Sequence, residues 1–244
     1  MDPQYAAAYP ALYRHHWWWR VRERILIDEI RRILSRVPNP RILDVGCGSG
    51  LFFDALQPFG HVEGIEADRP AVEHSGRWRD RIFVGELDRT YVPREPFDLI
   101  LMLDVLEHVP AAAGLVARGA EILKPGGRLL ITVPAFNWLW TAHDELNHHV
   151  RRYTAGELRA LIRGAGLTVA ETRYLFQSLV LPKLLVRARE AVSRLPPRIA
   201  EIPSPAVNRA LQLWCRGEHS VFGWLPFGSS VMAVAAAAER HEQA

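Results

Sequence analysis

The sequence predicts an α/β fold: a doubly wound, mostly parallel sheet with a helical N-terminal lid and a helical cap insertion near the C-terminus. Two observations support this fold class. The first is a glycine-rich turn, Gly46 to Gly50, that joins a short apolar run to a helical one. The second is a succession of five apolar runs separated by helical patterns, which favours a right-handed doubly wound sheet.

The composition is that of an ordinary globular chain. The 244 residues are 49% hydrophobic and 23% charged, with a net charge of +3, which suits one decorated α/β domain. Basic residues form no dense block with interleaved aromatics, so we expect no nucleic-acid partner. The two cysteines, Cys47 and Cys215, are too few for a disulfide framework or a zinc pattern. Without a signal sequence or a long apolar run, the chain is expected to be cytoplasmic and to lack a membrane span.

Strands are predicted from apolar, β-branched runs, and helices from apolar spacing and capping residues. Phe97–Leu103 is continuously apolar, as expected for a parallel strand covered on both faces. Thr154–Glu157 is a capping box that opens a helix. The other predicted strands are Arg41–Val45, His61–Glu66, Arg81–Leu87, Arg128–Val133, Leu167–Ala170 and a last strand after the turn at Leu225. The other predicted helices are Trp17–Leu34, Leu51–Leu56, Leu115–Leu123, Tyr174–Leu195 and Val207–Cys215.

The chain divides into an N-terminal lid, a ligand-binding core, a cap insertion and a last strand with a tail, at residues 1–40, 41–173, 174–220 and 221–244. Residues 1–14, rich in Ala, Pro and Tyr, are predicted to be a loose arm. Three tryptophans from Trp17 onwards fit either a lid over a ligand or a face packed on the domain. Residues 134–149 should form a long loop over the strand ends, and residues 194–205 a hinge-like segment.

The glycine turn predicts a nucleotide-like ligand, because glycine lets the backbone approach a ligand and a helix start offers free N–H groups. Its spacing is G-x-G-x-G, whereas dinucleotide-binding turns have G-x-G-x-x-G. Asp44 lies two positions before the turn. A carboxylate there disfavours a phosphate and favours a ligand with a cationic centre and an amino group. Glu66, 20 residues after Gly46, is placed to accept both hydroxyls of a ribose.

Two motifs resemble those of the class I S-adenosylmethionine (SAM)-dependent methyltransferases. Asp44-Val-Gly-Cys-Gly-Ser-Gly50 resembles the first motif of that family, and Asp104-Val-Leu-Glu-His-Val109 resembles the fourth. The resemblance is strong over about residues 41–135. It implies a seven-stranded Rossmann-like sheet with an antiparallel last strand, whose final hairpin holds Val169 and Met232. It also implies SAM as the cofactor and S-adenosyl-L-homocysteine as its product.

The resemblance further implies the residues that bind the cofactor. Arg22 would reach the methionine carboxylate, a role for which Arg20 and Arg24 compete. Glu86 would contact the adenine amino group, Leu87 would flank the adenine ring, and the backbone at Leu103 would meet the cofactor. The complete implied set is Arg22, Asp44, Gly46, Cys47, Gly48, Gly50, Glu66, Ala67, Glu86, Leu87, Leu103 and His108.

A base is useful when the methyl acceptor is a hydroxyl, and histidines near the strand ends are the candidates. His143, followed directly by Asp144, is the first choice, and His108, His148 and His149 are the others. The His143–Asp144 pair could equally serve only to pin its loop.

A divalent metal is an alternative element of the site. Asp104, Glu107 and His108 form a D-x-x-E-H pattern that looks like the metal-binding E-x-x-E-H of ubiquinone-biosynthesis O-methyltransferases. In those enzymes a magnesium-like ion assists an oxygen acceptor. Many metal-free family members share the L-E-H-V part of the pattern, so the sequence favours a site without metal.

These features predict a SAM-dependent methyltransferase that acts on an oxygen of a small-molecule or lipid-linked acceptor, with nitrogen or carbon left open. The acceptor should lie under the N-terminal lid and the His143 loop. The alternatives are a binding scaffold with a degenerate methyltransferase fold and a nicotinamide-dependent reductase. The amphipathic stretch Tyr174–Leu195 leaves peripheral membrane contact open, although a cap packed on the domain is favoured. The chain is expected to be a monomer or a homodimer.

Overall fold

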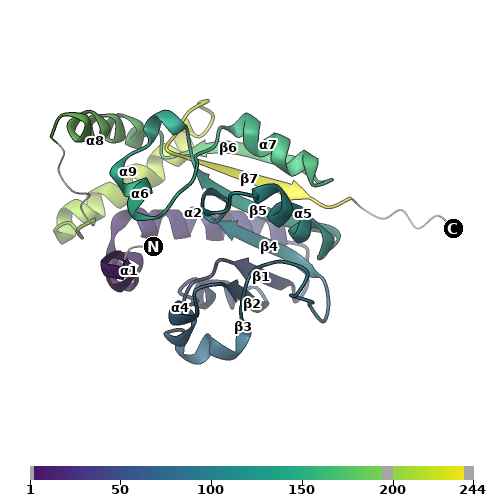
Figure 1. Cartoon of the computed structure of the whole chain (residues 1–244). Helices are drawn as coiled ribbons and strands as arrows, with labels where there is room; N and C mark the ends of the chain where they lie inside the picture. The colour runs from purple at the N-terminus through teal and green to yellow at the C-terminus, as the bar shows by residue number, and fades with distance from the viewer. Residues whose placement is uncertain (1–2, 194–199, 239–244) are drawn as a thin grey trace.

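The computed structural model describes residues 3–193 and 200–238 and confirms the doubly wound sheet (Figure 1). Seven strands of these residues lie in the order β3-β2-β1-β4-β5-β7-β6. Strands β1 to β5 pair in parallel with one another, and β7 runs antiparallel to both β5 and β6. The strands are β1 (Arg41–Val45), β2 (His61–Glu66), β3 (Ile82–Val84), β4 (Phe97–Leu103), β5 (Leu123–Pro134), β6 (Thr168–Leu175) and β7 (Ser230–Ala236). Val169 and Met232 lie in the final hairpin as expected.

Helices cover both faces of the sheet (Figure 1). The α-helices are α1 (Pro3–His15), α2 (Trp17–Leu34), α3 (Phe53–Leu56), α4 (Arg69–Glu73), α5 (Ala112–Glu121), α6 (Ala142–Leu146), α7 (Ala155–Gly164), α8 (Val180–Ser193) and α9 (Pro205–Phe222). Short 3-10 turns are η1 (Gly76–Arg81), η2 (Leu106–His108), η3 (Asn137–Leu139) and η4 (Gln177–Leu179). The capping box at Thr154 opens α7 as predicted, with the Glu157 side chain accepting from the Thr154 backbone.

The central strand β4 shows how the apolar sequence builds two cores. Successive side chains of a strand point to opposite faces of the sheet. Leu99 and Leu101 accordingly join the buried cluster under α2, while Ile100 and Met102 join the one under α5 and α7. All four side chains are fully buried. A strand buried on both faces needs this unbroken apolar run, and its polar ligand-binding groups are therefore left to its carboxyl end.

The prediction of a loose arm is wrong for the described residues from Pro3 onwards, because they form α1. Tyr5, Tyr9 and Tyr13 recur at four-residue spacing, so their rings share one face of the helix. Tyr5 and Tyr13 are buried, and the Tyr9 ring meets the Trp19 ring of α2 edge to face, with 6.1 Å between centroids. The Ala and Pro content led to the prediction of a loose arm. The three tyrosines instead give α1 an aromatic face that packs against its neighbours.

Other differences concern the ends of elements. Strand β3 is shorter than predicted, so Glu86 and Leu87 lie in the bend that follows it. Strand β5 starts at Leu123, earlier than the predicted Arg128, and its pairing with β4 has an irregularity between Phe97 and Leu99. The predicted loop 134–149 contains η3 and α6. The predicted hinge falls partly, and the tail from residue 239 wholly, outside the described residues.

Helices α8 and α9 lie between β6 and β7 in the chain, and α9 packs against α2 at one end of the sheet (Figure 1). The Asn208 side chain of α9 accepts a hydrogen bond from the Trp17 backbone (2.7 Å) and donates one to the His15 carbonyl (2.7 Å). Asn208 therefore ties the cap to the junction of α1 and α2. None of the described helices is long and apolar enough to cross a bilayer.

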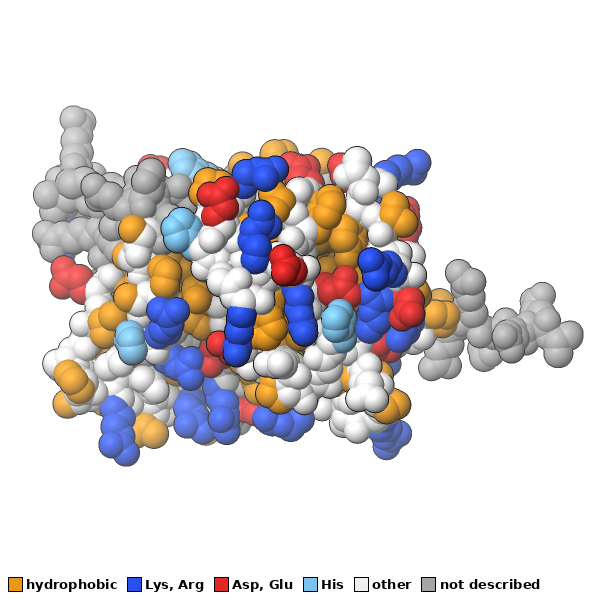
Figure 2. Space-filling view, turned by 90° about the horizontal axis from the view of Figure 1, so that it is seen from below, with side chains coloured by type: hydrophobic (Ala, Val, Ile, Leu, Met, Phe, Trp, Pro, Cys, Tyr) orange, Lys and Arg blue, Asp and Glu red, His pale blue; other side chains and the backbone are white. Residues whose placement is uncertain are grey.

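Basic side chains lie among acidic, apolar and uncharged ones on the face that Figure 2 shows. Two exposed arginines of α2 are paired within the helix: Arg31 and Arg24 both contact Asp28, at 2.7 and 3.6 Å. Such exposed i,i+3 and i,i+4 pairs contribute little stability each.

Candidate active site

A cavity of about 1880 Å³ lies at the carboxyl ends of the parallel strands. The last residues of β1, β2 and β4 line it from the sheet side: Val45, Glu66 and Leu103. The lid helices α1 and α2 and the cap helix α8 close it from other sides. Most small-ligand pockets measure roughly 300–1,000 Å³. The cavity therefore has room for a cofactor and a second ligand beside it.

The glycine turn forms one wall of this cavity. Gly46 and Gly48 have φ of +71° and +56°, a region that side chains rarely adopt. A Cβ atom on Gly46 would also lie 2.7 Å from Cγ2 of Val105. The turn that follows β1 thus packs directly on the segment that follows β4. The two stretches that carried the family resemblance are neighbours in space.

Two carboxylates flank the turn. Asp44 is buried, and burial raises its pKa to about 7, with nearby Arg22 opposing the shift and Glu66 adding to it. The Glu66 carboxylate accepts hydrogen bonds from the backbone N–H groups of Gly48 and Asp68, each at 2.8 Å. Glu66 therefore fixes the turn against the end of β2, and its side chain faces the cavity.

The structure brings almost all predicted cofactor residues to this cavity. The predicted residues that line it are Arg22, Asp44, Gly46, Cys47, Gly48, Glu66, Ala67, Glu86, Leu87, Leu103 and His108. Gly50 is the exception. Its φ is +73° and its N–H donates a hydrogen bond to the Cys47 carbonyl at 3.0 Å, so Gly50 stabilises the turn without lining the cavity.

Arg22 reaches the site from the lid. Its Nη2 lies 2.8 Å from the Asp104 carboxylate and donates to the Thr132 hydroxyl at 3.1 Å. Thr132 in turn donates to Asp104 at 3.0 Å. Asp104 has a φ of +57°, an uncommon value for a residue other than glycine. These contacts hold the end of β4 in a strained turn and couple it to α2.

Asp144 pairs with a residue other than the one predicted. It caps α6 through the Thr141 backbone at 2.8 Å and receives two hydrogen bonds from Arg152, at 2.8 and 2.7 Å. It also contacts Nδ1 of His149, at 2.8 Å. Burial would raise the pKa of Asp144, but the hydrogen bonds from His149 and Arg152 hold it well below its usual range. The carboxylate is therefore ionised and orients His149.

His143 stands apart from its sequence neighbour. No hydrogen bond joins the His143 ring to Asp144 among the described contacts; the ring meets the Asn147 amide at 3.2 Å and the Tyr5 ring edge to face. Burial lowers the pKa of His143 to about 4, so the ring is neutral at physiological pH. His143 lines the cavity, whereas Asp144 and the exposed His148 do not.

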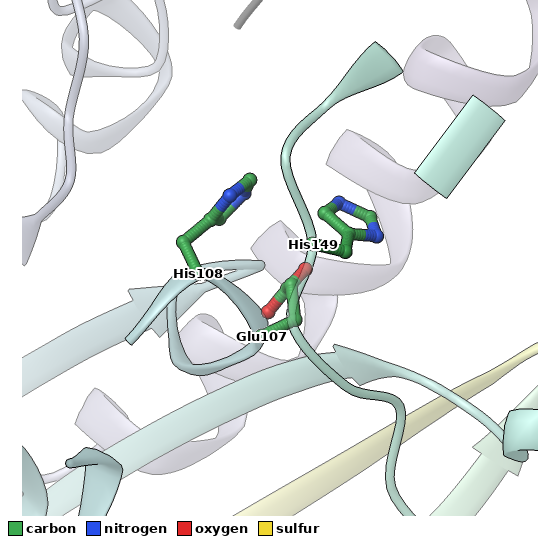
Figure 3. A group of neighbouring side chains, drawn as sticks. All are labelled: Glu107, His108 and His149. Carbon is green, nitrogen blue, oxygen red and sulfur yellow. The ribbon is translucent and has the colours of Figure 1, made fainter. Parts of the chain in front are cut away.

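A cluster that sequence reasoning did not assemble lies where η2 meets the loop after α6 (Figure 3). Glu107, His108 and His149 offer one ligand atom each, and these atoms lie within 4.8 Å of one another. Asp104, which the D-x-x-E-H pattern placed in the group, forms an ion pair with Arg22 instead.

Lys183 of α8 is another residue to which the sequence assigned no role. It lines the cavity, and burial lowers its pKa to about 8. The one sequence signal for Lys183 was its position between apolar residues on α8.

The fold and the glycine turn define a class I SAM-dependent methyltransferase. The chain belongs to the methyltransferase-domain family, whose model matches residues 18–172, more than half of the sequence. Its cofactor is accordingly SAM. This membership gives no support to the reductase or the non-catalytic scaffold that the sequence left as alternatives.

Curated relatives agree with this class. The chain is 28% identical over 183 residues to a probable SAM-dependent methyltransferase of Mycolicibacterium smegmatis, covering 73% of this chain and 70% of that protein. It is 30% identical over 154 residues to the ubiquinone biosynthesis O-methyltransferase of Thiobacillus denitrificans, covering 57% and 61%. A Xylella fastidiosa enzyme of the same name is 38% identical over 110 residues, covering 41% and 45%. The chain thus spans about half the length of several relatives that it matches.

Solved structures share the fold. A SAM-dependent methyltransferase from Archaeoglobus fulgidus superposes with a TM-score of 0.56 at 14% identity, covering 88% of this chain and 94% of that one. The N-methyltransferase NodS of Bradyrhizobium japonicum, in complex with S-adenosyl-L-homocysteine, gives 0.52 at 17% identity, covering 91% and 88%.

Proposed function

We propose that the chain transfers the methyl group of SAM to a hydroxyl oxygen of a small-molecule or lipid-linked acceptor. The cavity carries this proposal, because it continues past the predicted cofactor residues. Beyond Asp104 it is lined by His143, by Tyr5 and Trp18 of the lid, and by Val186 of the cap. An acceptor seated there would face the cofactor along the line that an in-line displacement needs.

The choice of oxygen rests on the proton that a hydroxyl acceptor must lose. His143 is a neutral imidazole on the cavity wall and can accept that proton. The O-methyltransferases among the curated relatives add support. His108 also faces the cavity, but it belongs to the cluster with Glu107 and His149. We therefore assign the base role to His143 and none to the exposed His148.

A lipid-linked acceptor is favoured by the cap. Val186 of α8 lines the cavity, while Leu181 and Leu185 on the same helix are each 64% exposed. Trp214 of α9 and Trp224 beyond it are 60% and 77% exposed. Exposed tryptophan and aliphatic side chains on one part of the surface suit a membrane interface. An apolar tail could pass from the cavity along α8 while the surface of the cap rests on lipid.

The test uses SAM, the full chain and three acceptors: a catechol, the same catechol carrying a short prenyl chain, and a primary amine. Formation of S-adenosyl-L-homocysteine is measured. We expect turnover with both catechols, faster with the prenylated one, and a loss of ~100-fold or more in the His143→Ala variant. Turnover with the amine alone would overturn the oxygen assignment. A His143→Ala variant at full rate would return His143 to a structural role.

A further inference from the structure

We propose that Glu107, His108 and His149 bind a first-row transition-metal ion such as Zn²⁺. Glu107 is the observation that points to a ligand. Its side chain is buried, at 1% exposure, and neither carboxylate oxygen has a hydrogen-bond partner among the described residues. A buried carboxylate without partners is costly, and such groups are normally paired or bound to metal. The nearest groups in this cluster are two imidazoles (Figure 3).

The rings of His108 and His149 lie close enough together to bind one ion. His108 and His149 stand edge to face with 4.8 Å between their centroids. Two ligands of one ion at ~2.1 Å lie at most ~4.2 Å apart. The ligand atoms here lie within 4.8 Å, so small side-chain rotations close the site. All three residues also line the cavity, which leaves coordination positions open on that side.

An outer contact fixes the nitrogen that the His149 ring presents. Asp144 accepts from Nδ1 of His149 at 2.8 Å, which leaves Nε2 of that ring as the free ligand atom. Arg152, itself buried, holds Asp144 with two hydrogen bonds. A carboxylate behind a histidine is a recurrent feature of metal sites, because it orients the ring and raises its basicity.

The backbone brings the two segments together before any ion is bound. Val150 N–H donates to the Glu107 carbonyl at 2.8 Å, and the Tyr153 hydroxyl donates to the Leu106 carbonyl at 3.0 Å. His148 takes a φ of +57°, and this turn directs the next residue, His149, toward Glu107. The ligand set therefore joins η2 to a loop some forty residues later, which a local motif cannot describe.

The donor set selects the ion. Two imidazoles with one carboxylate suit Zn²⁺, Fe²⁺ and their neighbours, whereas Mg²⁺ prefers oxygen ligands. The proposed site therefore differs from the D-x-x-E-H hypothesis in its ligands and in its metal. Asp104 is not among its ligands, because the Asp104 carboxylate forms an ion pair with Arg22. Binding rests on these three side chains alone. If the proposed function holds, the ion would lower the pKa of an acceptor hydroxyl at the open positions.

The experiment is calorimetric titration of the untagged, EDTA-treated full chain with ZnCl₂ and separately with MgCl₂, without SAM or acceptor. We expect a single saturable Zn²⁺ site and no saturable Mg²⁺ site. Glu107→Gln and His149→Ala should each weaken Zn²⁺ binding at least ~100-fold. His61→Ala, which removes an exposed histidine at the start of β2, should leave it unchanged. Asp104→Asn should stay within about threefold of the unmodified chain, because Asp104 is not a ligand.

Thermal unfolding gives a second measurement, since an ion that binds the folded chain raises Tm. Zn²⁺ should raise Tm of the unmodified chain and of His61→Ala, but not of Glu107→Gln or His149→Ala. The proposal is overturned if the unmodified chain binds no Zn²⁺, or if the ligand variants bind it as tightly. Loss with Asp104→Asn but not His149→Ala would restore the D-x-x-E-H set. None of these outcomes depends on methyl transfer, so failure here leaves the proposed function standing.

Discussion

Nη2 of Arg22 lies 2.8 Å from the Asp104 carboxylate, and this ion pair joins the lid helix α2 to the end of β4. The Arg22 side chain is 13% exposed and that of Asp104 31% exposed, so the pair lies at the inner edge of the cavity. The guanidinium is held in place there by Asp104 and Thr132, and we propose that it contacts the carboxylate of the cofactor. The lid and the sheet are thereby linked through the binding site.

Replacing Arg22 should weaken SAM binding. Arg22→Met removes the cation that we propose to face the methionine carboxylate, and we expect a loss of about 1.5–3 kcal/mol, as for a hydrogen bond to a charged group. Calorimetric titration with SAM measures it. Arg24→Met is the matched control, since Arg24 is exposed and forms an ion pair with Asp28 at 3.6 Å on the outer side of α2. Equal SAM affinity in both variants would remove Arg22 from the cofactor site.

SAM affinity should rise with pH up to about 7. Burial raises the pKa of Asp44 to about 7 from its ordinary value near 4, and the cationic sulfonium favours the ionised form. Below pH 7 binding must first remove that proton, so affinity should fall by up to about tenfold per pH unit. The comparison is SAM titration at several pH values in the unmodified chain and in Asp44→Asn. An identical pH slope in the two proteins would contradict this role.

The same carboxyl group should make the ligand-free chain more stable in mild acid. Because its folded pKa is raised, the protonated form stabilises the fold fully below its ordinary value, and this contribution is lost as pH rises through about 7. Asp44→Asn removes that part of the pH dependence in urea unfolding.

Arg152 should be a major stabilising residue. Its side chain is 1% exposed, and its partner Asp144 is fully buried. Removing one member of a buried pair leaves an uncompensated charge, so Arg152→Met should lower the free energy of unfolding by about 3–5 kcal/mol. Urea unfolding measures the loss. Arg151→Met is the matched control, because Arg151 forms an exposed pair with Glu157 and should cost less than about 1 kcal/mol. Similar values for the two variants would contradict the assignment.

The exposed face of α8 should bind lipid. Leu181→Asp with Leu185→Asp removes two exposed aliphatic side chains and adds negative charge, so co-sedimentation with anionic phospholipid vesicles should fall several-fold. Val92→Asp introduces the same charge at a 77% exposed valine far from the cap in sequence and should have no effect. If the unmodified chain does not sediment with vesicles, a lipid-linked acceptor loses its structural support.

The core strands and the cofactor turn could be predicted because each is determined by a short, continuous stretch of sequence. An apolar run such as Phe97–Leu103 must be buried on both faces, and the glycine spacing before α3 dictates the turn. Arrangements made by distant segments could not be predicted. Asp144 pairs with His149 because the loop turns at His148. Adjacency in sequence had favoured His143. The proximity of Glu107 to His149 likewise depends on how the loop after α6 packs against η2.

The most direct test of the cofactor site is calorimetric titration of the untagged full chain with SAM and, separately, with NADH. The account predicts saturable micromolar binding of one SAM per chain and no binding of NADH, because Asp44 before the glycine turn disfavours a pyrophosphate. Asp44→Ala and Glu66→Ala should each weaken SAM binding by about 1–3 kcal/mol. SAM binding unchanged in both variants, or no SAM binding by the unmodified chain, would contradict it.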